Sequence, residues 1–119
     1  MGKFELILIL IGIVLSSIGA LLLKLGAIEI VYNKRLGEIG IQIISNWKII
    51  AGLLFYFIPA LIWIFLLKKI NLTFLQPFFS LVYVVTPIFS IFFLGETISI
   101  TRWIGIFVII LGLSITVIN

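Results

Sequence analysis

Apolar residues fill four long blocks of this chain, and the few charged side chains lie mostly between the blocks. Each block holds about 20 residues, the length that a helix needs to cross a ~30 Å hydrocarbon layer. Of the 119 residues, 64% are hydrophobic and 10% are charged, and the mean hydropathy is +1.47, far outside the range of a soluble domain. We therefore predict an all-α integral membrane protein with four transmembrane helices in a single domain, residues 1–119.

Charged residues and prolines set the expected limits of the four spans. We place the spans at residues 4–27, 47–67, 73–94 and 100–118, with residue 32 as the alternative end of the first span. Asn46 is expected to cap the second span, and Pro77 and Pro87 predict a kink in the third. For residues 33–46 we expect a loop with an apolar piece on the membrane interface.

The N-terminal segment has features of a signal peptide. Lys3 precedes an apolar run, and the run reaches the small residues Ser17 and Gly19, which imitate a cleavage site. The largely apolar run continues past these residues to Val31, however, and three further spans follow. We therefore expect the first segment to be retained as a membrane-spanning helix.

Side chains that could catalyse a reaction are scarce. The chain has no cysteine and no histidine, which excludes disulfides, thiol nucleophiles, imidazole chemistry and most zinc sites. Its four acidic residues lie at or near the ends of predicted helices. We expect no enzyme activity, no cofactor and no metal. The net charge of +4 is scattered over helix ends, where it meets anionic lipid headgroups, so we expect no nucleic-acid partner.

Three predicted helices carry a polar or aromatic strip when residues are placed about 100° apart around the helix axis. Such strips indicate a shared polar groove, and they supply the candidate substrate-binding residues. These are Ser16, Ser17, Lys24, Tyr56, Trp63, Gln76, Ser80, Tyr83 and Ser90, joined by Arg102 near the start of the fourth span. In the alternative interpretation, the hydroxyl groups of the third span only form hydrogen bonds between helices, worth under about 1 kcal/mol each.

The fourth predicted helix has a ridge of small residues in place of a polar strip. Ridges of this kind let helices pack closely, and we interpret this one as the dimer interface, with packing inside the chain as the alternative. Lys and Arg are nearly balanced between the two sides of the membrane, which permits an antiparallel homodimer. A heterodimer with a similar small subunit is also open. The members of the ridge are Gly105, Ile109, Gly112 and Thr116.

Several short motifs, taken in order, resemble the small multidrug resistance branch of the drug/metabolite transporter superfamily, an EamA-like group. The likeness covers essentially the whole chain. Its motifs are Gly12, Gly19 and Lys24 in the first span, Gly95 and Glu96 before the last, and Gly105 with Gly112 in the ridge. Within that branch, the chain is most similar to the small flippase subunits that move aminoarabinose-undecaprenyl phosphate across the bacterial inner membrane. That likeness is carried by Pro77-x-x-Ser80-Leu81 and Arg102-Trp103-x-Gly105.

One position departs from the drug-exporting members of that branch. Those proteins resemble one another in a membrane-embedded glutamate on the first helix, which binds protons and cationic substrate in competition. Counted back from Gly19 and Lys24, that position is Ser16 in this chain. Without the carboxylate, proton-coupled export of organic cations becomes the alternative function.

Lys24 has no acidic residue three or four positions away to neutralise it. Three interpretations are open. The side chain could extend to the headgroups at the end of its helix. Its ammonium, with Arg102 or Lys48 nearby, could hold an anionic headgroup. It could also form an ion pair with Glu96 or Glu29.

The resemblance implies a dimeric flippase in the inner membrane. Its substrate would be an anionic lipid, polyprenyl phosphate or its glycosylated form, moved by alternating access while the isoprenoid tail stays in the bilayer. A small multidrug resistance-type exporter of organic cations is the first alternative. An accessory subunit that stabilises a larger membrane complex is the second, and the polar strips argue mildly against it.

Overall fold

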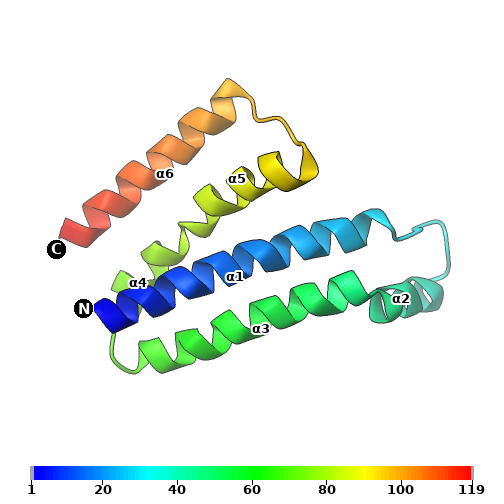
Figure 1. Ribbon diagram of the computed structural model, residues 1–119, viewed down its shortest axis with the longest axis horizontal. Helices are drawn as coiled ribbons and strands as arrows, with labels where there is room; N and C mark the ends of the chain where they lie inside the picture. Colours follow the sequence, from blue (N-terminus) through cyan, green and yellow to red (C-terminus); the bar gives the residue numbers. More distant parts are fainter. Residues whose placement is uncertain (1, 119) are drawn as a thin grey trace.

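The computed structural model describes residues 2–118, and every regular element within that range is an α-helix (Figure 1). Four segments are long and apolar enough to cross a membrane: α1, α3, α4 together with α5, and α6. This confirms the predicted all-α architecture with four spans, that of a multi-pass membrane protein. The helices are α1 (Lys3–Ile28), α2 (Leu36–Ser45), α3 (Trp47–Leu67), α4 (Leu72–Phe79), α5 (Val82–Leu94) and α6 (Ile100–Ile118).

Glycines bring α1 and α3 together as an antiparallel pair (Figure 1). Gly12, Gly19 and Gly26 recur at intervals of seven residues along α1, and all three face α3. A methyl group added to Gly19 would lie 2.9 Å from the carbonyl oxygen of Gly52, and one added to Gly52 would lie 2.9 Å from that of Gly19. Small residues on facing helices allow such close packing in membranes. We call these four glycines the glycine seam.

The third span is interrupted between α4 and α5 by Ser80 and Leu81. The Ser80 amide donates to the carbonyl of Pro77 at 3.0 Å, a tighter i to i−3 bond than the helical pattern, and the Ser80 hydroxyl donates to the same carbonyl. A serine hydroxyl that competes for a helix carbonyl weakens the regular hydrogen-bond ladder. The interruption therefore lies one turn after Pro77, while α5 continues through Pro87.

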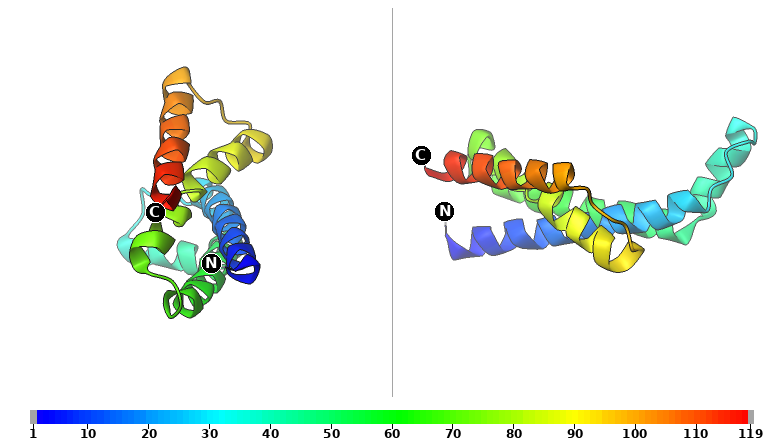
Figure 2. Two further views of the ribbon diagram at one scale, coloured as in Figure 1. Left: turned by 90° about the vertical axis from the view of Figure 1, so that its left-hand side faces the viewer. Right: turned by 90° about the horizontal axis from the view of Figure 1, so that it is seen from above.

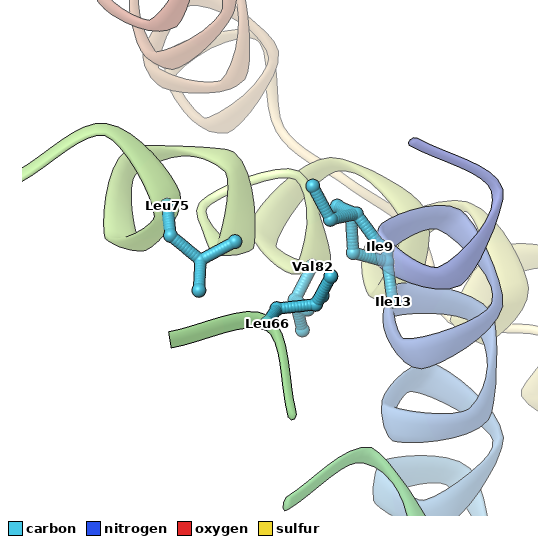
Figure 3. Close-up of a cluster of buried hydrophobic side chains, with 5 residues drawn as sticks. All are labelled: Ile9, Ile13, Leu66, Leu75 and Val82. Atoms are coloured by element: carbon cyan, nitrogen blue, oxygen red, sulfur yellow. The ribbon is translucent and has the colours of Figure 1, made fainter. Parts of the chain in front are cut away.

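A small apolar core forms where α4 and α5 cross the first turns of α1 and the last turn of α3 (Figure 3). Its side chains come from four different helices, so it joins the interrupted span to the α1–α3 pair. Within lipid, this packing is favoured by dispersion contacts more than by removal of water. The buried members are Ile9, Ile13, Leu66, Leu75 and Val82.

The last helix, α6, lies on the outside of the molecule against α4 and α5 (Figure 2). None of its residues is buried, and only Ile106, Ile109 and Leu113 are half-buried. The chain leaves α5 through Gly95, whose φ of 71° is the left-handed conformation that favours glycine after a helix. Most of the α6 surface therefore remains without a partner in the single chain.

The connection between α1 and α3 contains α2, which runs across the direction of the spans (Figures 1 and 2). The Gln42 side chain accepts a hydrogen bond from the Val31 amide at 2.9 Å and donates one to the Val31 carbonyl at 3.0 Å. The Asn46 side chain accepts from the amide of Lys48 at 3.0 Å, which confirms the predicted cap of α3. The expected interfacial piece is thus a helix of 10 residues.

Candidate functional site

An open cavity of about 420 Å³ lies beside the middle of α1, between α3 and α4. The polar and aromatic residues predicted from three separate helices meet here, since Ser16 comes from α1, Tyr56 and Trp63 from α3, and Gln76 from α4. No charged side chain lines it. The remaining lining residues are Pro59, Ala60, Ile64 and Phe79.

Ser16 stands out among the residues that line this cavity. It lies near the midpoint of α1, it is fully buried, and its hydroxyl oxygen has no hydrogen-bond partner within residues 2–118. Leaving a buried hydroxyl unpaired costs about 1–3 kcal/mol, so such groups in native proteins call for an explanation. A polar group of a bound molecule would supply the missing partner once side-chain movement exposed this hydroxyl to the cavity.

The wall of the cavity between α3 and α4 is held by Trp63. Its indole N–H donates to the Gln76 side-chain oxygen at 3.4 Å, and its ring packs edge to face with that of Phe79, with the centroids 5.2 Å apart. Both contacts fix the indole, which has an apolar body and one polar group. Tyr56 lies at the rim with 36% of its surface exposed. The wall thus offers apolar contact with a few hydrogen-bonding groups.

A second, smaller cavity of about 170 Å³ lies on the other side of α1, next to α5. Lys24 and Ser90 line it, together with Glu96 from the connection to α6. The Ser90 hydroxyl donates to the Glu96 carboxylate. Lys24 forms no ion pair within residues 2–118, whereas Lys48 takes the carboxylate of Glu29. Of the predicted partners for Lys24, Glu29 is therefore occupied elsewhere.

Ser17, next to Ser16 in the chain, lines neither of these two cavities. It is fully buried, and its hydroxyl accepts a hydrogen bond from Thr86 on α5 at 3.1 Å. The sequence predicted a single groove shared by three polar strips. The structure instead divides these residues between separate cavities, because α1 lies between α3 and α5 and presents a polar residue to each. The sequence did not predict Thr86 as a site residue. The only feature that pointed to it was a hydroxyl group within an apolar run, one position from the predicted polar strip.

Two further candidates line neither cavity. The Ser80 hydroxyl bonds to the carbonyl of Pro77 in the turn between α4 and α5, and Tyr83 is 63% exposed. Their placement shows that the polar strip of the third span is divided by the interruption after α4. Residues before the break turn toward the first cavity, and Ser90 after it turns toward the second.

The remaining candidates belong to α6. Arg102, Gly105 and Ile109 line a groove of about 360 Å³ between α5 and α6, with Pro87 and Ile98. Gly112 has nothing within 4 Å of an added methyl group. The Thr116 hydroxyl donates to the Leu113 carbonyl at 2.7 Å, a bond inside its own helix. The predicted ridge is therefore divided in the single chain, because Gly105 and Ile109 line the groove beside α5 whereas Gly112 and Thr116 are exposed.

Comparisons of the chain with models of known families, with curated proteins and with solved structures found no match. The chemistry of the cavities is thus what bears on function. Within residues 2–118, no group of three or more acidic residues is arranged to hold a metal ion. The first cavity offers hydrogen bonds in an apolar setting, and the second offers one ammonium beside a hydroxyl and a carboxylate.

Proposed function

We propose that this protein is a membrane transporter of the small multidrug resistance type, a flippase that moves an anionic lipid-linked substrate by alternating access in a dimer. The substrate class is polyprenyl phosphate or its glycosylated form, and the location is the bacterial inner membrane. One observation carries the proposal. A fully buried, unpaired hydroxyl at Ser16 lines an uncharged cavity at the middle of a membrane-spanning helix.

The depth of the cavity supports transport over an accessory role. Transporters bind their substrates near the bilayer midplane, often beside a helix that is interrupted there. Ser16 lies near the midpoint of α1, and the third span breaks at Ser80 and Leu81. Irregular backbone at membrane depth is tolerated where it lies against protein or a cavity. A purely structural subunit has no need of either feature.

The distribution of charge favours an anionic substrate over an organic cation. No acidic residue lines the first cavity, so a cation would lose its hydration there without a counter-charge. Two of the acidic residues near helix ends are paired with lysines, since Glu5 lies 3.9 Å from Lys69 and Glu29 pairs with Lys48. Glu96 accepts a hydrogen bond from Ser90 and lines the same cavity as Lys24, so a phosphate would meet the Lys24 ammonium beside a carboxylate.

In this proposal the polar residues along α1 have different roles. Lys24 holds the phosphate on the side of the membrane where α1 ends, since an ammonium is a compact charge suited to phosphate oxygens. The Ser90 hydroxyl lines the same cavity as Lys24 and can form a hydrogen bond with a sugar or phosphate held there, whereas Ser16 lines the cavity on the other side of α1. The isoprenoid tail remains in lipid outside the open cavity, so only the headgroup requires shelter.

The test is a transport assay with fluorescent polyprenyl phosphate in liposomes. Methionine is apolar and about as long as lysine, so Lys24→Met removes the charge with little change in length. It should weaken lipid binding or flipping by on the order of 1.5–3 kcal/mol, the value of a charge-assisted hydrogen bond. Lys24→Arg should retain much of the activity. Loss of insertion or stability with normal transport would instead show that Lys24 only extends to the headgroups.

Ser16→Glu provides the contrasting variant. A carboxylate at that depth should repel phosphate and favour cations, so lipid transport should fall while binding of an organic cation should rise. If Lys24→Met transports at the unmodified rate and Ser16→Glu is also harmless, the anionic-lipid proposal is wrong. Transport of an organic cation by the unmodified protein would favour the multidrug alternative.

A further inference from the structure

We infer that α2 and the two basic residues before it form a docking surface for an anionic lipid bilayer. In this arrangement Leu36, Ile41 and Ile44 enter the interface between headgroups and acyl chains, and Lys34 and Arg35 contact lipid phosphates. The surface lies outside both cavities, so the inference stands whether or not the protein is a flippase.

The position of α2 follows from its neighbours in the chain. α1 ends at Ile28 and α3 begins at Trp47, and both are long and apolar enough to cross the membrane. The segment between them is therefore held at the level of the membrane surface. It also runs across the spans rather than along them (Figures 1 and 2). A helix in that orientation lies along the bilayer, as interfacial helices do.

The two sides of α2 differ in what they contact. One side rests on the chain, where Ile39 is half-buried and Gln42 forms its two hydrogen bonds with Val31. The exposed side is apolar, since Ile41 is 67% and Ile44 is 73% exposed. Helical spacing of three residues places these two isoleucines together. The hydrogen bonds between α2 and the rest of the chain thus lie on its inner side, and the exposed side carries Ile41 and Ile44, with Glu38 and Ser45 exposed at its margin.

Residues at the two ends of α2 extend this exposed apolar surface. Leu36, its first residue, is 87% exposed, and Trp47, the first residue of α3, is 68% exposed. Tryptophan is enriched at the level of the membrane interface, where its ring meets acyl chains and its N–H meets headgroups. The exposed surface therefore continues into an interfacial anchor.

The charges before α2 identify the kind of bilayer. Lys34 and Arg35 are exposed, and no carboxylate lies within ion-pair distance of either one in residues 2–118. Lys48 is different, because it hydrogen-bonds and pairs with Glu29 and so lowers the pKa of that carboxyl. The pair is neutral overall. The two free cations outnumber Glu38, which leaves a basic segment beside an apolar one, the pattern that anionic lipid attracts.

A lipid surface fits better here than a second protein. Stable protein interfaces bury about 800 Å² on each partner, and a helix of 10 residues with a few exposed apolar side chains offers too little area alone. A bilayer requires no such matching surface, and connectivity already holds α2 against it.

The absence of cysteine in the chain makes the first experiment direct, because any introduced thiol is unique. Ile44→Cys carries a fluorescent label on the exposed side of α2, and Thr97→Cys carries it in the exposed connection between α5 and α6 as the control. Liposomes hold nitroxide lipids as membrane quenchers, with iodide on both sides as the aqueous quencher. We expect nitroxide to quench the label at 44 more strongly than the label at 97, and iodide to do the reverse.

Two results would overturn the inference. One is equal iodide quenching at both positions, which would place the exposed side of α2 in water. The other is a label at 44 that is shielded from iodide and nitroxide alike but becomes accessible when the protein is diluted in lipid, which would mean that a second copy covers α2.

The second experiment measures the charge contribution. Energy transfer from tryptophan to pyrene-labelled phosphatidylglycerol reports its binding to the full-length protein in phosphatidylcholine micelles. Lys34→Gln and Arg35→Gln should each lower the affinity about fivefold, the factor expected for one basic residue near an anionic surface. Arg35→Lys keeps the charge and should retain the affinity. Unchanged affinity in both glutamine variants would show that Lys34 and Arg35 do not contact lipid phosphate.

Discussion

Gly19 and Gly52 show how a single absent side chain sets the distance between two helices. Each lies opposite the other's backbone carbonyl, so the space that a methyl group would need is filled by an atom that cannot rotate away. Glycines elsewhere in the chain differ, and Gly40 in α2 has nothing within 4 Å of an added methyl group. The same residue type therefore has a structural role at one position and none at another.

This difference predicts opposite results from the same substitution. Gly19→Ala should lower the free energy of unfolding by about 1–3 kcal/mol, since the added carbon forces α1 and α3 apart. Gly40→Ala should cause no loss, because alanine favours helix and meets open space. Denaturation in mixed detergent micelles measures both. Equal stability of the two variants would show that the seam does not limit the approach of the helices.

At the scale of elements, periodicity predicted which residues share a helix face but not which helix that face meets. The four spans and the Asn46 cap followed from apolar run length and a local side-chain pattern. The division of Ser16 and Lys24 between two cavities could not follow, because it depends on α1 lying between α3 and α5. Likewise, the prolines predicted an irregular third span but not its position, since the break lies at Ser80 and Leu81, where the Ser80 amide and hydroxyl both bond to the Pro77 carbonyl.

Substitutions in α6 should affect the dimer more than the single chain. Gly112 is exposed and has open space around it, so Gly112→Leu should leave the single chain stable but weaken the dimer about tenfold or more, by filling a close helix contact. Gly105→Leu should also weaken it, with added disturbance of the groove beside α5. Ser114→Leu, on the opposite side of α6, is the matched control.

Sedimentation in mild detergent measures the dimer fraction of each α6 variant. An unchanged dimer fraction for both glycine variants would mean that the ridge is not the interface. A loss with Ser114→Leu as large as with Gly112→Leu would place the interface on the opposite face of the helix.

The whole molecule is thin, with principal extents of 51 × 37 × 22 Å. Its smallest dimension is about two helix diameters, which explains why few residues are buried although most are apolar. Lipid or a partner must cover the remaining surface. α1 begins and α6 ends on the same side (Figure 1), and that side carries Lys3, Lys68 and Lys69, whereas the other basic residues lie on the opposite side.

This near balance predicts weakly biased or dual topology. Orientation follows the asymmetry of Lys and Arg, so reporters fused to the C-terminus should be active on both sides of the membrane. A matched variant with extra lysines after residue 118 should shift the reporters toward one side. A single strict orientation, together with cross-links between parallel α6 helices, would contradict an antiparallel dimer.

The glycine seam also bears on the order of events during synthesis. All of its contacts lie between residues that precede the end of α3, so their formation does not require α4, α5 or α6. Chains of this kind assemble from the N-terminal side as they emerge. The α1–α3 pair can therefore pack first, and α4 and α5 then pack against it. The last helix to be made is α6, and most of its surface remains available to another chain.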